Sequence, residues 1–147
     1  MFRIMFILVY LITALGSASM VLSDDLVADF QSAQITEAHL LLDEDANSGV
    51  LSFRITNNSS GNLTILGVTD TGHMQSKIIV RLDDTNYAEL GSITLLREEN
   101  LDLTTTHIFI QLSNITEPIK ADQKIDLKLV FTNGEMPISA HVAPSKQ

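Results

Sequence analysis

The chain has 147 residues, enough for one domain with a hydrophobic core and too few for two. Acidic residues outnumber basic ones by 18 to 9, and the net charge of −9 disfavours binding to nucleic acid or to anionic lipid. There is no cysteine, which excludes disulfides, thiolate metal sites, thiol catalysis and a lipid anchor on an N-terminal cysteine.

Residues 1–19 have the order of segments typical of a secretory signal peptide. Arg3 precedes an apolar run over residues 4–15, and small residues follow. The run is about twelve residues long, shorter than the roughly twenty that a membrane-spanning helix needs. We expect cleavage near Met20 and no membrane span in the mature chain; a retained N-terminal anchor is the alternative. The expected location is the bacterial periplasm, with secretion as the second choice.

Most of the remaining chain alternates between apolar and polar residues, the pattern of half-buried β-strands. In the clearest run, residues 124–132, one face holds Ile125, Leu127, Leu129 and Phe131. Similar or weaker alternation occurs at residues 38–42, 50–56, 63–68, 77–82, 92–96, 101–112 and 138–142. The sequence therefore predicts about eight strands.

Turn-forming residues separate these runs, and Asn133-Gly134 between two of them predicts a β-hairpin. Only residues 25–34 have a pattern compatible with a helix. We expect an all-β fold of two antiparallel sheets packed face to face, or a small barrel. Residues 20–34 would form a linker or short helix, and residues 35–147 the β-sandwich domain. The side chains expected between the sheets are Ile108, Ile110, Ile125, Leu127, Leu129 and Phe131.

Motifs for catalysis are missing from the sequence. No glycine-rich phosphate loop, nucleophile elbow or zinc-hydrolase pattern occurs, so we do not expect an enzyme. The acidic run at residues 42–49 lacks the ligand alternation of a calcium loop and is interpreted as a solvated turn. Histidines occur every 34 residues, at His39, His73, His107 and His141, but in dissimilar contexts. We interpret this spacing as coincidence, since true repeats would share their apolar pattern.

Soft and nitrogenous side chains are the remaining candidates for chemistry. In the run at residues 104–112, alternation places His107 and Phe109 together on the polar face. His73 and Met74 are adjacent in a turn. Imidazole and thioether ligands suit Cu(I), although a surface histidine beside a surface aromatic would give the same pattern.

The sequence from about residue 35 to 142 resembles the PCu(A)C family of periplasmic copper chaperones, which are exported cupredoxin-like β-sandwiches. SGVLSFRITNNSSGNLTILGVT, residues 48–69, is similar to the family segment that ends in an L-x-G-V-type run. Residues 101–131 resemble the family's H-x-M strand with its following Leu, Pro-Leu and alternating strand. His107 matches the family histidine, Leu112 the leucine, and Pro118-Ile119 the Pro-Leu pair.

The resemblance implies a copper site, but the ligand motif is incomplete here. The family pattern is [H/M]-x10-M-x21-H-x-M. Without gaps it places Met74, Thr85, His107 and Phe109 at the four ligand positions. Phe cannot coordinate, and a Thr hydroxyl is a hard ligand for a soft ion. A gap before residue 107 would instead place Ser76 and Tyr87 at the first two positions.

The function implied by this resemblance is binding or delivery of Cu(I) in the periplasm. We expect the metal ligands to be His107 with Met74 or His73, and Cu(I) to be held weakly or to have been lost. The implied partner is a copper-accepting subunit or assembly factor of a respiratory oxidase. The alternative function is a copper-free β-sandwich that serves as a binding or scaffold module.

Overall fold

Ten β-strands and a short 3-10 helix make up residues 29–143, the part of the chain described by the computed structural model. The expected signal peptide, its cleavage near Met20 and most of the expected linker fall in residues 1–28, outside the described residues, as do residues 144–147. The elements are η1 (Phe30–Ser32), β1 (Ala33–Leu42), β2 (Gly49–Asn57), β3 (Leu63–Thr69), β4 (Gln75–Arg81), β5 (Tyr87–Leu90), β6 (Ile93–Leu95), β7 (Asn100–Asp102), β8 (Ile108–Ser113), β9 (Lys124–Phe131) and β10 (Gly134–Ala143).

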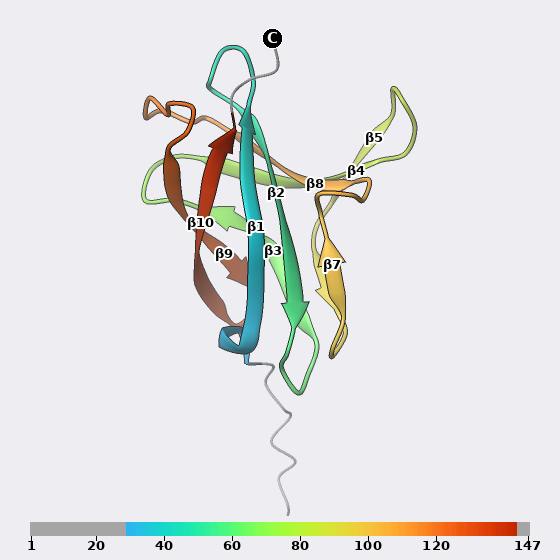
Figure 1. The fold of residues 1–147 in the computed structure, drawn as a ribbon. Coiled ribbons are helices and arrows are strands. Elements are labelled where there is room, and N and C mark those ends of the chain that lie inside the picture. Colours follow the sequence, from blue (N-terminus) through green and yellow to red (C-terminus); the bar gives the residue numbers. More distant parts are fainter. Residues whose placement is uncertain (1–28, 144–147) are drawn as a thin grey trace, which may run out of the picture.

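The strands pair into one continuous sheet. Its hydrogen-bonded order is β5-β4-β8-β2-β1-β10-β9-β3-β6, and β7 pairs with β2 beyond the end of β8. Along this path only β1 and β10 run parallel, and the other pairs are antiparallel. The all-β prediction is confirmed. Of the two arrangements expected, two separate antiparallel sheets are not observed, and the single curled sheet is closer to the small barrel. The single mixed sheet curls so that β3 and β9 lie behind β1 and β2 (Figure 1).

Irregular pairing at two places helps to curl the sheet. The register of β1 on β2 shifts between Thr36 and His39, where Glu37 has a φ of 53°. The register of β3 on β9 shifts between Ile65 and Gly67. Such bulges bend a strand and increase its twist. Regular alternation in the sequence gives no sign of them, which is why flat sheets packed face to face were expected.

The two ends of the curl meet where β3 contacts β4. The backbone N–H of Val68 donates a 2.9 Å hydrogen bond to the hydroxyl of Ser76. A Cβ at Gly67 would lie 2.6 Å from that hydroxyl, and Gly67 has a φ of 150°. Glycine is therefore required at position 67 for the close approach that brings β4 against β3.

The core fills the inside of the curled sheet. Four of the six expected core residues are buried: Ile110, Leu127, Leu129 and Phe131. Ile108 and Ile125 are only partly buried, although they pack against the core. Both lie near the start of their strands, where the neighbouring strands cover them less completely. The predicted hairpin is present, since β9 and β10 pair from Phe131 and Gly134 onward.

Three local expectations need correction. Residues 30–32 form a single 3-10 turn capped by Asp29, and a strand begins at Ala33, so the described part of residues 25–34 contains no α-helix. The expected strand at residues 101–112 is interrupted, because a turn separates β7 from β8. The sequence also gave no indication of β5, whose four residues are too few for alternation to be recognised.

Candidate metal site

A side-chain network fixes the turn at residues 103–107 that leads into β8. The carboxylate of Asp102 accepts hydrogen bonds from the hydroxyl and backbone N–H of Thr104 and from Nε of Arg54. These bonds, that from the Thr104 hydroxyl foremost, lower the pKa of Asp102 from 3.8 to about 2. Leu103 inserts into the core, and its N–H donates to the carbonyl of Phe53 at 2.9 Å. The last residue of this turn therefore has a defined place.

His107 is that residue, and it lies exposed immediately before β8. Its backbone carbonyl accepts a 2.8 Å hydrogen bond from the N–H of Arg81, the last residue of β4. In the next positions of the ladder, Ile108 pairs with Val80 and Phe109 with Ile79. The imidazole is thus attached to a fixed backbone at the junction of β4 and β8 and is open to solvent.

Aromatic side chains occupy the surface beside His107. The rings of Phe109 and Tyr87 meet edge to face, with centroids 6.3 Å apart and an interplanar angle of 82°. The guanidinium of Arg81 lies over the Tyr87 ring, 5.9 Å from its centroid. We call Arg81, Tyr87 and Phe109 the aromatic cluster. The sequence resemblance aligns Phe109 with a methionine ligand; on that alignment, the cluster would occupy the space of a thioether.

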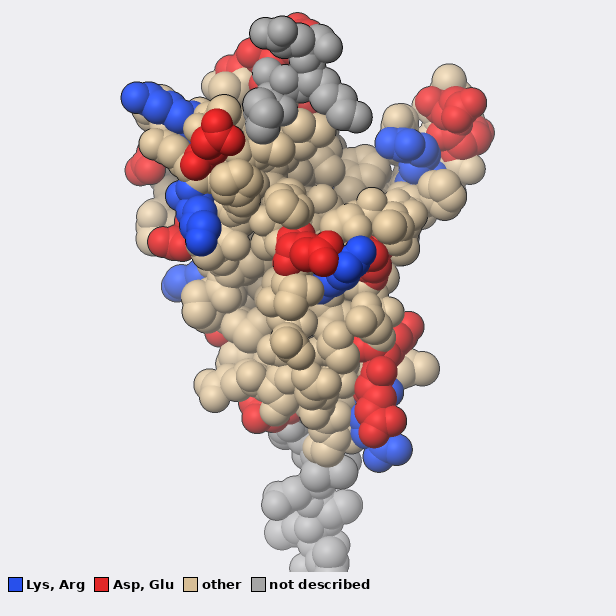
Figure 2. Space-filling view, viewed as in Figure 1, with Lys and Arg blue, Asp and Glu red and all other residues tan. Residues whose placement is uncertain are grey.

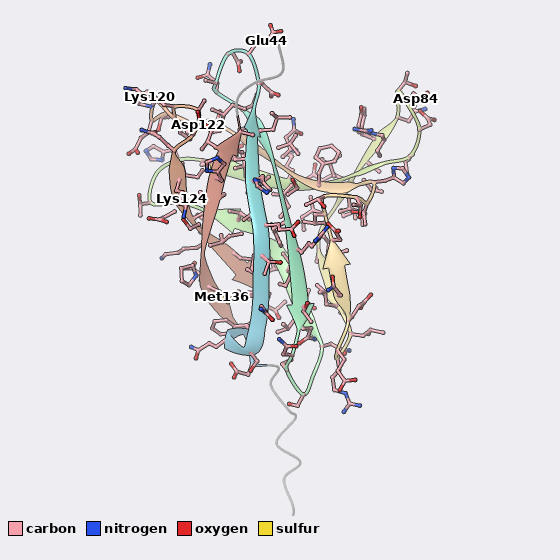
Figure 3. The ribbon with its side chains drawn as sticks, in the orientation of Figure 1. Glu44, Asp84, Lys120, Asp122, Lys124 and Met136 are labelled. Carbon is pink, nitrogen blue, oxygen red and sulfur yellow. The ribbon has the colours of Figure 1, made fainter. Side chains whose placement is uncertain are left out.

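Thr85, the ungapped counterpart of the second ligand, does not face this cluster. It lies in the turn at residues 83–86 between β4 and β5, where its N–H and hydroxyl donate to the carboxylate of Asp83. Bonds to that carboxylate, the one from the Asn86 side chain foremost, lower the pKa of Asp83 to about 2. Tyr87, which the gapped alignment places at the second ligand position, contacts Phe109. This contact favours the gapped alignment over the ungapped one at that position. Asp84, in the same turn, is at the tip of the projecting hairpin (Figure 3).

Met74 and His73 lie at the other end of the β4–β8 pair. Met74 directly precedes Gln75, which pairs with Ser113, the last residue of β8, whereas His107 precedes its first residue. From Met74 to Arg81 is about seven residues, or about 23 Å along β4. Two ligand atoms on one copper ion lie at most about 4.6 Å apart, twice a metal–sulfur bond of ~2.3 Å. The structure therefore does not bring Met74 and His107 together.

Ser76, the other candidate for the first ligand, is also distant from His107. It pairs with Leu112 near the far end of β8, and its hydroxyl is held by Val68. Met74 is partly buried against the core, and His73 is exposed in its turn. Within residues 29–143, no three His, Asp or Glu side chains are already grouped as a metal site. Likewise, no helix in the described segment has the length and apolar character to cross a membrane.

Acidic side chains are dispersed over the molecule. Figure 2 shows Asp and Glu in small separate groups, interspersed with Lys and Arg, on the face in view. Arg54 pairs with Glu37 at 2.7 Å and with Asp102 at 2.8 Å, and Lys77 pairs with Glu89 at 2.9 Å. On this face the acidic side chains are thus spread and do not form one cation-binding patch.

Solved structures that are similar to this chain include PCuAC domains and apo-DR1885. The copper-bound PCuAC domain from PmoF2 is 17% identical, with a TM-score of 0.66 over 77% of this chain and 93% of that domain. The apo PCuAC domain from PmoF1 is 17% identical, with a TM-score of 0.63 over 79% of this chain and 97% of that domain. Apo-DR1885 from Deinococcus radiodurans is 14% identical, with a TM-score of 0.50 over 99% of this chain and 97% of that one.

The comparisons with sequences found no relatives. No protein-family model matches the chain, and no curated protein sequence matches it. The structural matches establish that more than three quarters of this chain adopts the fold of PCuAC domains. The resemblance inferred from the sequence is therefore confirmed as a likeness of fold.

Proposed function

We propose that this protein binds Cu(I) in the manner of the PCu(A)C type, at a reduced site in which His107 is the retained ligand. One observation carries the proposal most directly. His107 is exposed at the start of β8 with its backbone fixed by Arg81, on a fold shared with a copper-bound domain. The role is binding rather than catalysis.

The chemistry of the neighbouring side chains limits how tightly such a site holds copper. A single imidazole is supplied by His107, while Phe109 and Tyr87 have no thioether to add. Arg81 places a cation on the same surface. The pair His73–Met74 offers one imidazole and one thioether at the far end of β8, as a separate candidate. Weak or exchangeable binding follows for either location.

Anaerobic titration with Cu(I) under reducing conditions tests this proposal. His107→Ala should remove most of the binding, and a combined His73→Ala and Met74→Leu variant should leave it unchanged. Gln111→Ala is the control, because it removes an exposed polar side chain from β8 itself. Unchanged Cu(I) affinity in His107→Ala would contradict the proposal. A loss of Cu(I) binding only in the variant with His73→Ala and Met74→Leu would place copper at the other end of the β4–β8 pair.

Export and partner choice form the second part of the proposal. The signal-like sequence of residues 1–19 supports delivery to the periplasm. The copper recipient would be a respiratory oxidase subunit or assembly factor, as in the family that the sequence resembles. Cell fractionation with N-terminal sequencing should find the protein in the periplasm, starting near Met20. A cytoplasmic protein with an intact N-terminus would contradict this part.

A copper-free binding module is the second candidate, and the aromatic cluster favours it. The Tyr87–Phe109 contact fills two positions that the gapped motif assigns to ligands. Tyr87 is 53% exposed, so the cluster offers an aromatic contact surface. This function gains support if Cu(I) binding is absent in the wild-type protein, or if no substitution in or beside the cluster alters it.

A further inference from the structure

Two histidines that the sequence places 102 residues apart are neighbours in the sheet. His39 on β1 and His141 on β10 are Cα partners in the parallel pair. Their rings meet edge to face, with centroids 6.4 Å apart and an interplanar angle of 85°. The next residues, Leu40 and Val142, are fully buried. Because side chains alternate along a strand, both imidazoles are on the outer face of the sheet.

A carboxylate lies beside the second histidine. Oδ1 of Asp122 is 3.9 Å from Nε2 of His141, and the Asp122 side chain is 83% exposed. The loop that carries it is tied to β10 by two backbone bonds, from Asp122 N–H to the Val142 carbonyl at 2.9 Å and from Val142 N–H to the Gln123 carbonyl at 2.8 Å. Asp122 is labelled beside the upper part of β10 in Figure 3. The position of Asp122 is therefore fixed by these backbone bonds rather than by its contact with His141.

Two of the three separations lie near those found around one metal ion, although the side chains are not grouped as a metal site as they stand. Nitrogen and oxygen ligands bind at about 2.0–2.2 Å, so a pair on the same ion lies within about 4.2 Å, and the 3.9 Å between His141 and Asp122 satisfies this limit. Two imidazole rings on one ion have centroids up to about 6.4 Å apart when they are opposite each other, and closer when they are adjacent. The observed 6.4 Å is at that limit. His39 and Asp122 are exposed, so their side chains are free to rotate toward a shared ion.

We propose that His39, His141 and Asp122 form a binding site for a divalent transition-metal ion, with Cu²⁺ bound most strongly and Zn²⁺ less so. Imidazole ligands suit both ions, and Cu²⁺ exceeds Zn²⁺ in the usual order of affinities. Each histidine comes from a different strand of a paired, rigid sheet, which reduces the entropy lost when the ion binds. Lys124 is the cross-strand partner of His141 and opposes the bound charge. The positive charge of Lys124 keeps the affinity of the site for a metal ion moderate.

This site does not depend on copper binding at His107. His39 is on β1 and His107 directly precedes β8, with β2 between them, which is about 10 Å at ~4.8 Å per strand spacing. The two sites also differ in chemistry: two imidazoles and a carboxylate favour divalent ions, whereas a family-type His and Met site favours Cu(I). Each can therefore be tested while the other is removed.

Titration of the purified protein with Cu²⁺ in air, against a competing chelator, tests the proposal. His39→Ala and His141→Ala should each weaken Cu²⁺ binding by at least about tenfold, and Asp122→Asn by a few-fold. Asp84→Asn is the matched control for Asp122→Asn, since it removes one exposed carboxylate at the tip of the β4–β5 hairpin. This control should bind Cu²⁺ as the wild-type protein does.

Ring signals in NMR spectra give a second measurement that does not rely on the variants. Addition of diamagnetic Zn²⁺ to the wild-type protein should shift the ring signals of His39 and His141 together, at the same stoichiometry. The proposal is overturned if the rings do not move together, or if His39→Ala and His141→Ala retain wild-type Cu²⁺ affinity. A wild-type protein that binds no Cu²⁺ overturns it as well. All the substituted side chains are at least partly exposed, so the variants should keep the fold, which circular dichroism can verify.

Discussion

The aromatic cluster and the His39–His141 pair lie on the same sheet but differ in how their side chains were brought together. At the aromatic cluster, the sequence motif of a copper site is partly present, yet rings occupy positions where ligands are expected. At the histidine pair there is no sequence motif, yet parallel pairing of β1 and β10 sets two imidazoles side by side. Strand register, rather than spacing along the chain, decides which ligands can share an ion.

The largest effect should come from the core on which both regions depend. Leu129 is fully buried, and truncation to Ala should lower the free energy of unfolding by about 2–5 kcal/mol. Ile125→Ala is the matched control, because Ile125 is only partly buried and should cost less. Urea denaturation of the two variants measures the difference. Equal losses would show that the core does not extend along β9 as described.

Installing thioethers at the aromatic cluster should make it resemble a Cu(I) site. The double change Tyr87→Met and Phe109→Met places two soft ligands beside His107, and Met is flexible enough to replace a ring at modest packing cost. Cu(I) affinity should rise by at least about tenfold, equivalent to ~1.4 kcal/mol. Competition with a chelator under reducing conditions measures this.

The ungapped alternative provides the control for that experiment. Thr85→Met with Phe109→Met should gain less, because Thr85 is in the hairpin turn and its side chain donates to Asp83. A larger gain from the change at 85 than from that at 87 would contradict the placement of these residues. If no variant containing Phe109→Met gains affinity, His107 does not face a copper-binding surface.

Acid should weaken the turn that positions His107. The pKa of Asp102 is lowered from 3.8 to about 2 in the folded protein, so its ionised form is stabilised by folding. The stability from this group is complete above the unfolded pKa and is lost as pH falls from about 4 to about 2. Asp102→Asn should therefore have a shallower loss of stability over this range than the wild type. Parallel profiles in denaturant titrations would contradict this role for Asp102.

The smallest effect concerns the charge beside the histidine pair. Lys124→Gln removes a cation opposite His141, and Cu²⁺ affinity should rise about twofold, since exposed charges interact weakly in water. Lys128→Gln is the control, because it removes an exposed lysine further along β9. An equal rise in both variants would indicate a general effect of net charge rather than a local one.

Alternation in the sequence predicted most of the strands, and four of the six core residues it predicted are buried, because burial of one strand face leaves a direct pattern. The turn residues Asn133-Gly134 predicted the β9–β10 hairpin. Alternation could not predict that Asp102 would bind Thr104 and Arg54 and break the strand at residues 101–112 into two. Bulges such as that at Glu37 leave no periodic signal either. The parallel pairing of β1 with β10, which alternation also does not reveal, joins the strands into one sheet instead of two.

The candidate site was less accessible to prediction than the fold. His107 could be identified from its strand and from the family resemblance, but the position of Met74 depends on how β4 pairs with β8. Likewise, the regular spacing of histidines was interpreted as coincidence, and no pattern in the sequence indicates that β1 and β10 run parallel with His39 opposite His141. Pairing between distant segments is a property of the folded sheet.

Strand register separates Met74 from His107, so any copper at His107 is bound without Met74. NMR spectra of the wild-type protein during anaerobic Cu(I) titration test this most directly, through the ring signals of His107 and the methyl signal of Met74. We expect the His107 ring to shift while the Met74 methyl stays unchanged at the same stoichiometry. If both signals shift together and saturate with one Cu(I) ion, the two residues share a site. That result would contradict their separation by strand register.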